Sequence, residues 1–152
     1  MFDNDAIGRE QTAQQAPRPN PDLRTLDRLV GTWTVSGEAE GTVTYAWTEG
    51  GFFLLQHVDL GGTRGLEVIG HESKYGEEPS ADIRSRYYGF AAGETLDYTY
   101  ELAGDTLTIW MGERGSPAYY EGTFDEAGDV LTGAWHYPGG GGYSTVSTRV
   151  RG

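Results

Sequence analysis

Residues 41–72, GTVTYAWTEGGFFLLQHVDLGGTRGLEVIGHE, decide the fold of this chain. The hydrophobic pattern in this stretch has a period of two, and glycine pairs at Gly50-Gly51 and Gly61-Gly62 interrupt it. A period of two is typical of β-strands with one buried face, and short glycine-containing joins are typical of hairpins. The stretch therefore predicts three consecutive antiparallel strands.

The same pattern extends on both sides of this stretch, from Thr32 to the end of the chain, with turn signals about every 8–12 residues. An open meander would expose two unpaired edges, whereas closure removes them. An all-β, up-and-down antiparallel barrel of about ten strands is therefore expected. The expected strands are residues 32–38, 41–48, 52–60, 63–72, 82–90, 94–102, 105–112, 118–125, 129–137 and 143–150.

Before the first strand, the sequence predicts a polar leader and one short helix. Residues 1–19 contain too few apolar side chains to order themselves, so they are expected to be disordered. Asn20 is a favourable N-cap for a helix that Gly31 ends, and Pro21 suits its first position. This helix is expected to cap one mouth of the barrel, and residues 20–152 are expected to form a single domain.

The chain has 152 residues, a formal net charge of −12 and no cysteine. Without cysteine there is no disulfide framework and no thiolate metal site. The acidic charge and the lack of a basic cluster disfavour nucleic acid and anionic membranes as partners. With no signal peptide and no long apolar run evident, a cytoplasmic protein is expected. The polar connection 73–81 is expected to be an exposed loop, with a lid over the barrel as the alternative.

Hairpin turns determine which residues face each other, because opposed residues in one hairpin have a constant sum of residue numbers. A two-residue turn at Gly61-Gly62 places Gln56 opposite Glu67. The other expected pairs are Leu54–Ile69 and Phe52–His71 across the same turn, Trp47–Phe52 and Tyr45–Leu54 across residues 48–51, and Tyr100–Leu107 and Tyr98–Ile109 across Ala103-Gly104.

The inward face that results combines aromatic and aliphatic side chains with polar groups. A core filled for stability alone would hold fewer polar groups, because an unpaired buried hydroxyl or amide costs about 1–3 kcal/mol. We therefore interpret the interior as a ligand cavity, with a filled core of hydrogen-bonded tyrosines as the alternative. The expected lining residues are Trp33, Tyr45, Trp47, Phe52, Leu54, Gln56, Glu67, Ile69, His71, Ser85, Tyr87, Tyr98, Tyr100, Ile109, Tyr120 and Trp135.

Glu67 and His71 are the candidate catalytic pair, because a carboxyl and an imidazole on one inward face can act as general acid and base. Four residues along a strand span about 13 Å, so a substrate would have to lie between them. Gln56 is expected to bond the Glu67 carboxyl, and desolvation is expected to raise the pKa of Glu67. The alternative is a Gln–Glu pair that closes a barrel mouth. The three histidines are separated by strand and face, so no metal site is expected.

Four segments carry a resemblance to a known family. Together they resemble an uncharacterised bacterial group, with many actinobacterial members, of lipocalin-like calycin barrels. The resemblance implies a ten-stranded barrel with a capping N-terminal helix and an internal cavity, and it brings no catalytic residues. The segments are LDRLVGTW at 26–33, YAWTEGGFFL at 45–54, GLEVIG at 65–70 and LTGAW at 131–135.

Nitrobindin-like relatives of that group bind haem through a histidine on a C-terminal strand. The last expected strand here has no histidine, and His136 falls on the outward face of the strand before it. Haem is the one cofactor that the resemblance suggests. Because no histidine is suitably placed to bind it, no cofactor is expected.

The leading functional hypothesis is binding of a small apolar or aromatic molecule inside the barrel. One alternative is a cofactor-independent isomerase or cyclase that uses Glu67 or His71 as acid or base. Another is a protein-interaction module that recruits a partner through its acidic surface.

Overall fold

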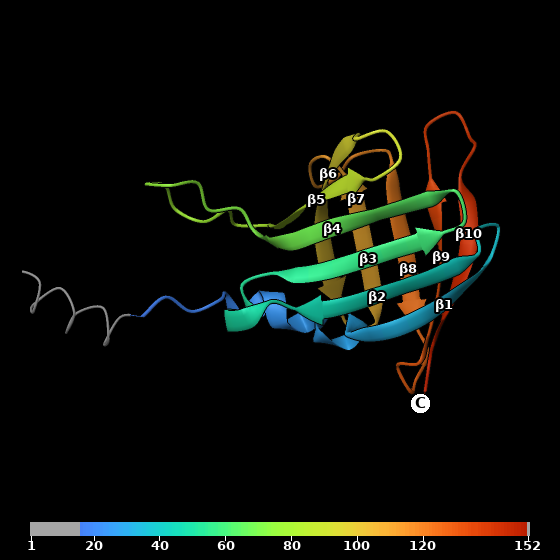
Figure 1. Cartoon of the computed structure of the whole chain (residues 1–152), viewed down its shortest axis with the longest axis horizontal. Helices are drawn as coiled ribbons and strands as arrows, with labels where there is room; N and C mark the ends of the chain where they lie inside the picture. The colour runs from blue at the N-terminus through green and yellow to red at the C-terminus, as the bar shows by residue number, and fades with distance from the viewer. Residues whose placement is uncertain (1–15, 152) are drawn as a thin grey trace, which may run out of the picture.

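Ten antiparallel strands form a closed barrel in the computed structural model, which describes residues 16–151 (Figure 1). Each strand pairs with its neighbours in sequence, and β1 pairs with β10 to close the ring. The expected up-and-down barrel is confirmed, and each expected strand matches the observed one to within two residues at either end. The strands are β1 (Gly31–Gly37), β2 (Gly41–Trp47), β3 (Leu54–Leu60), β4 (Thr63–His71), β5 (Ile83–Gly89), β6 (Thr95–Ala103), β7 (Thr106–Met111), β8 (Tyr119–Phe124), β9 (Val130–His136) and β10 (Tyr143–Arg149).

The predicted helix is present as a 3₁₀ helix, η1 (Pro21–Leu29). Asn20 caps it, because its side-chain oxygen accepts a hydrogen bond from the backbone N–H of Asp22 at 3.1 Å. Its buried side chains recur every third residue, which matches the three residues per turn of a 3₁₀ helix. They are Leu23, Leu26 and Leu29.

The expected leader falls mostly on residues 1–15, which lie outside the described residues. Residues 16–20 form no helix or strand. Within residues 16–151, no helix is both long and apolar enough to cross a membrane.

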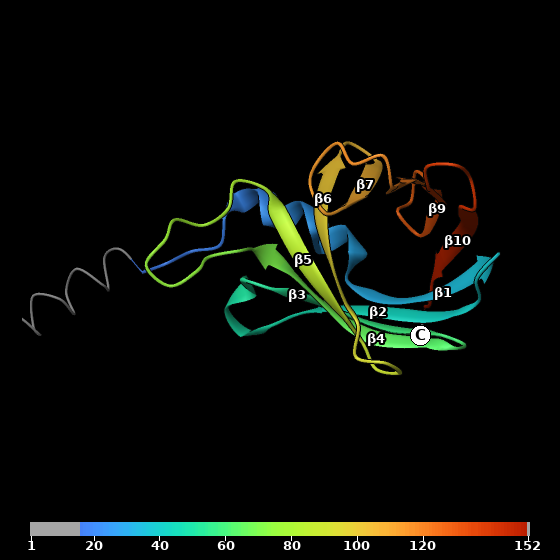
Figure 2. The same cartoon turned by 90° about the horizontal axis from the view of Figure 1, so that it is seen from above.

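The η1 helix closes one end of the barrel, which we call the helix end (Figure 2). Arg28 donates a hydrogen bond to the carbonyl oxygen of Gly104, in the β6–β7 turn, at 2.9 Å. The indole N–H of Trp47, at the end of β2, donates to the Asp27 carboxylate at 2.8 Å. The loops 38–40, 61–62, 90–94, 112–118 and 137–142 lie at the opposite end, which we call the far end.

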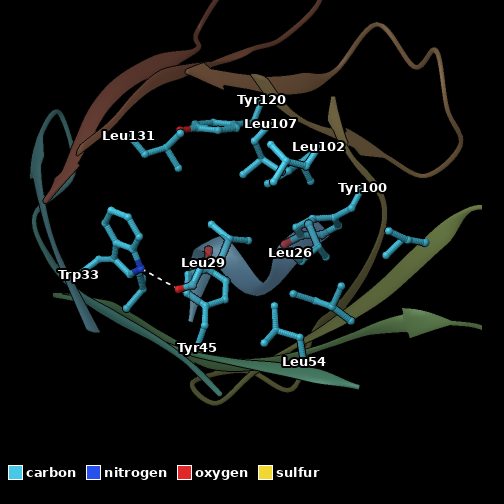
Figure 3. Close-up of a cluster of buried hydrophobic side chains, with 14 of the residues drawn as sticks. Leu26, Leu29, Trp33, Tyr45, Leu54, Tyr100, Leu102, Leu107, Tyr120 and Leu131 are labelled. Carbon is cyan, nitrogen blue, oxygen red and sulfur yellow. Dashed lines mark hydrogen bonds between the residues drawn. The ribbon is translucent and has the colours of Figure 1, made fainter. Parts of the chain in front are cut away.

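The helix end of the barrel is filled with apolar side chains. The three leucines of η1 point into the barrel and meet side chains from the surrounding strands, as Figure 3 shows for Leu26 and Leu29. Trp33 donates its indole N–H to the carbonyl oxygen of Leu29 at 2.8 Å, which joins β1 to the helix. Strand residues of this layer include Leu54, Ile69, Ile83, Leu102 and Phe124.

The strand register confirms the first hairpin prediction and corrects two others. Gln56 lies opposite Glu67 and Leu54 lies opposite Ile69, as expected for the Gly61-Gly62 turn. The corrected pairs are Tyr45–Gln56 and Trp47–Leu54 in place of Tyr45–Leu54 and Trp47–Phe52, and Tyr100–Ile109 and Tyr98–Met111 in place of Tyr100–Leu107 and Tyr98–Ile109.

Turn geometry explains both corrections. The connection 48–53 is longer than expected because it contains the 3₁₀ turn η2 (Glu49–Gly51), in which Gly50 and Gly51 have φ of 87° and 74°. Phe52 therefore lies outside β3 and pairs with neither Trp47 nor His71. In the later hairpin, Gly104 and Asp105 form the turn. Each correction is a shift of two residues, which leaves every side chain on its expected face.

Candidate functional site

A cavity of about 130 Å³ lies inside the barrel, on the far-end side of the layer that the helix fills. Its walls come from every strand except β5, so it is centred in the barrel and is not a groove on the outer surface. An apolar cavity of about 150 Å³ is large enough to hold benzene, so this one has the size of a single aromatic ring. The lining residues are Val35, Val43, Tyr45, Gln56, Leu60, Glu67, Tyr98, Tyr100, Leu107, Ile109, Tyr120, Leu131, Trp135, Tyr143, Thr145 and Ser147.

The structure brings eight of the expected lining residues together around this cavity, and Figure 3 shows three of them, Tyr45, Tyr100 and Tyr120, pointing inward from different walls. Five others lie inside the barrel without lining the cavity, and three belong to the helix end. The eight are Tyr45, Gln56, Glu67, Tyr98, Tyr100, Ile109, Tyr120 and Trp135; the five are Trp33, Leu54, Ile69, Ser85 and Tyr87; the three are Trp47, Phe52 and His71.

Strand β10 contributes lining residues that the sequence reasoning missed. Tyr143, Thr145 and Ser147 alternate along it and face the cavity. The outward neighbours Ser144, Val146 and Thr148 are mostly polar as well, so hydrophobicity does not distinguish the two faces of the strand. Ser147 pairs with Val35, whose side chain faces inward, and this pairing shows that Ser147 faces inward too.

Among residues 16–151, Glu67 is the one carboxyl in the cavity wall, and its residue surface is only 6% exposed. Its Oε2 accepts hydrogen bonds from the Ser85 hydroxyl at 2.5 Å and from the Tyr100 hydroxyl at 2.7 Å. Burial raises the pKa of Glu67, and these two hydrogen bonds partly oppose the rise. The carboxyl is therefore held in a fixed orientation and in a site that disfavours its charge.

Gln56 does not orient this carboxyl, although it lies directly opposite on β3. Its side-chain N–H donates to the Tyr45 hydroxyl at 2.8 Å instead. The expected Gln56–Glu67 hydrogen bond is therefore replaced by two separate contacts, one from Gln56 to Tyr45 and one from Tyr100 to Glu67. The orienting partners of Glu67 come from β5 and β6.

The cavity is lined by phenols whose ionisation is suppressed. Burial first, and the nearby Glu67 charge second, raise the pKa of Tyr45, Tyr98 and Tyr100. Burial raises the pKa of Tyr120 to about 12. These tyrosines therefore remain neutral hydroxyls at physiological pH, able to donate and accept hydrogen bonds.

Trp135 and two tyrosines form an aromatic wall of the cavity. The ring centroids of Tyr98 and Tyr120 lie 5.8 Å and 5.6 Å from that of Trp135, at tilted angles favoured by aromatic pairs. Tyr120 lies over Gly122 and Gly133, which pair across β8 and β9. A Cβ at either glycine would overlap the phenol, so these two glycines allow Tyr120 its place in the wall.

His71 lies at the helix end and not in the cavity wall. Its Nδ1 is 2.7 Å from the carbonyl oxygen of Ser80, and its Nε2 is 2.7 Å from Asp22 Oδ1. Both ring nitrogens are thus occupied by groups of the helix end, and Glu67 is bonded to Ser85 and Tyr100 instead. The structure does not bring Glu67 and His71 together as an acid–base pair.

Phe52 and Trp47 also belong to the helix end. Phe52 is 38% exposed on the 48–53 connection. The Trp47 ring lies under the Arg24 guanidinium, 4.8 Å from its centroid. The loop that contains residues 73–81 leaves the barrel at this same end, so it does not cover the cavity (Figure 1).

No group of three or more His, Cys, Asp or Glu residues with the arrangement of a metal site occurs within residues 16–151. His136 is exposed on β9 and stacks on Tyr119, with ring centroids 4.9 Å apart. Its outward position agrees with the face expected from the strand pattern. A scan against protein-family models and a search of curated proteins found no match to this chain.

Proposed function

We propose that this protein binds a small aromatic or hydrophobic molecule in the barrel cavity. The observation that carries the proposal is a cavity of about 130 Å³ inside a closed barrel, with aromatic walls and a few convergent polar groups. Ligand sites in proteins have this combination of apolar walls and a small number of placed polar atoms.

The volume limits the size of the ligand. Drug-sized ligands occupy pockets of roughly 300–1,000 Å³, whereas a cavity of about 150 Å³ accepts benzene. The proposed ligand therefore has one aromatic ring or an aliphatic group of similar size. Aliphatic contacts for it come from several strands: Val35, Val43, Leu107, Ile109 and Leu131.

The far end of the barrel provides the route of entry. Leu60, Trp135 and Tyr143 line the cavity and are each partly exposed, whereas the helix end of the interior is closed by the fully buried leucines of η1. Side-chain rotation of these three residues would open the cavity without unpairing the barrel strands, because rotamer changes leave the backbone hydrogen bonds intact.

Toluene is a suitable probe, because it is a single ring without a hydrogen-bonding group. We expect it to raise the melting temperature, and at about 100 times its Kd the stabilisation is about 2.7 kcal/mol. Isothermal titration calorimetry should give the same Kd. If saturating toluene changes neither quantity, the cavity does not bind single-ring ligands and the proposal is wrong.

A cavity-filling variant locates the binding. Ser147→Phe places a ring in the cavity from β10 and should abolish toluene binding. Thr148→Phe is the matched control, because Thr148 is exposed on the opposite face of the same strand and should leave binding unchanged. Circular dichroism checks that both variants fold, and Thr145→Leu is a milder substitution if Ser147→Phe does not. Binding that persists in a folded, cavity-filled variant would place the ligand elsewhere.

A further inference from the structure

The cavity contains a buried carboxyl without a cationic partner. Both hydrogen bonds to Glu67 reach Oε2, and no hydrogen bond within residues 16–151 reaches Oε1. None of the described lining residues is Lys, Arg or His. Buried carboxylates are normally paired with a cation, because an isolated charge in an apolar site is costly. Oε1 of Glu67 is thus an acceptor that the described protein leaves open to the cavity.

Aromatic rings surround this carboxyl. Tyrosine is the most frequent residue in the lining, with five members, and one tryptophan joins them: Tyr45, Tyr98, Tyr100, Tyr120, Tyr143 and Trp135. The face of an aromatic ring attracts a cation, and the attraction strengthens where water is excluded. Aromatic faces together with a carboxylate form the environment that favours an organic ammonium group.

From these two observations we propose that the cavity selects a single-ring molecule bearing an amine, which binds as its ammonium cation with the charge against Oε1 of Glu67. The inference rests on the proposed function and names the class of ligand. The ammonium group supplies the cation that Glu67 lacks, and the ring fills the remaining volume. A neutral ligand of the same shape leaves the carboxyl unpaired.

The charge of the whole chain acts in the same direction. A net charge of −12 raises the local concentration of small cations near the protein and lowers that of anions. This long-range attraction is weakened by salt, whereas the contact with Glu67 inside the barrel is screened much less. Salt dependence therefore separates the contribution of the surface from that of the cavity.

Benzylamine and benzyl alcohol are matched probes, because they have the same ring and differ in an ammonium against a hydroxyl group. Isothermal titration calorimetry near neutral pH and at high salt should show benzylamine binding at least about tenfold more tightly. In Glu67→Gln this preference should disappear. Glu121→Gln is the matched control, because Glu121 is exposed on the outer face of β8, and it should retain the preference.

The unchanged protein provides a second test that does not depend on the folding of a variant. Binding of an ammonium group requires the Glu67 carboxylate, and burial raises the pKa of Glu67, so binding favours loss of the Glu67 proton. The affinity for benzylamine should therefore rise from about pH 5 to about pH 8, whereas that for benzyl alcohol should not. Calorimetry in two buffers of different ionisation enthalpy should also detect the released proton.

The outcomes separate this inference from the proposed function. If toluene or benzyl alcohol binds and benzylamine binds no more tightly, the ammonium preference is wrong and the cavity is a neutral binding site. If Glu121→Gln removes the preference as completely as Glu67→Gln, surface charge causes it and the inference fails. If none of the three probes binds, the proposed function fails and the inference fails with it.

Discussion

His71 Nε2 lies 2.7 Å from Asp22 Oδ1, and this contact ties the end of β4 to the first turn of η1. On the other side of the ring, Nδ1 lies 2.7 Å from the carbonyl oxygen of Ser80. Each ring nitrogen thus lies within hydrogen-bond distance of an oxygen from a different segment. His71 therefore links the strand, the helix and the loop that follows β4.

Replacing His71 by Phe should lower the free energy of unfolding by about 1–3 kcal/mol. The substitution retains a ring but removes both hydrogen bonds, one of them to a carboxylate, and charged hydrogen bonds contribute about this amount. Urea denaturation measures the change. His57→Phe is the control, because His57 is exposed on β3 and should change stability by less than about 0.5 kcal/mol. Equal losses in the two variants would show that the link contributes nothing.

Replacing Arg149 by Met should lower the free energy of unfolding by about 2–4 kcal/mol. The Arg149 guanidinium lies over the Trp33 ring, 4.3 Å from its centroid. It also donates to the carbonyl oxygens of Val30, Arg28 and Gly128 at 2.5, 2.7 and 3.1 Å. These carbonyls lie where η1 joins β1 and where β8 turns into β9, so one side chain holds three segments together.

A lysine at this position should recover only part of that loss, because an ammonium group lacks the planar fork of donors. Arg86→Met is the control, because the Arg86–Asp97 pair is exposed on the outer face and such pairs contribute about 0–1 kcal/mol. Guanidinium chloride is unsuitable for this measurement because it screens ion pairs, so urea should be used. A loss at Arg149 no larger than that at Arg86 would contradict the assigned role.

The strand pattern predicted the barrel well because side-chain direction on a strand has a period of two. The 48–53 connection was expected to be two residues shorter, yet Tyr45 and Gln56 kept their inward faces. A shift of two residues changes the cross-strand partner but not the face. The length of that connection depends on the positive φ angles of Gly50 and Gly51. Glycine allows a positive φ but does not require it, so the sequence alone does not determine this backbone conformation.

The candidate site was predicted less completely, because strand direction does not determine position along the barrel axis. His71 has the same inward direction as Glu67, but η1 fills the end of the barrel where it lies. Arg149 pairs with the inward residue Trp33 and was missed because β10 lacks a clear alternation of apolar and polar residues. Tertiary packing of the helix against the strands decides both positions.

Gly122→Ala should lower the free energy of unfolding by about 1–3 kcal/mol, which is typical of overpacking a filled site. The new methyl group would overlap the Tyr120 phenol, which then has to leave its place in the cavity wall. Combining it with Tyr120→Leu should remove most of the loss. Gly62→Ala is the control, because no atom lies within 4 Å of a Cβ at that position. Thermal unfolding of Gly122→Ala, Tyr120→Leu, the double variant and Gly62→Ala tests the coupling between Gly122 and Tyr120. Additive losses in the double variant would contradict it.

Glu67→Gln should become more stable relative to the unchanged protein as pH rises. Burial raises the pKa of Glu67, so the folded protein keeps this proton to higher pH than the unfolded chain does. The unfolding free energy of the unchanged protein therefore falls as pH rises from about 4, the range where an ordinary glutamate ionises, through the raised pKa of the folded state. Glutamine has no proton to lose and avoids this decrease. Melting temperatures from about pH 4 to about pH 8 measure the difference between the two proteins. Glu121→Gln controls for the change in net charge, and a difference that is constant or shrinks with pH would show that the fold does not hold Glu67 in its neutral form.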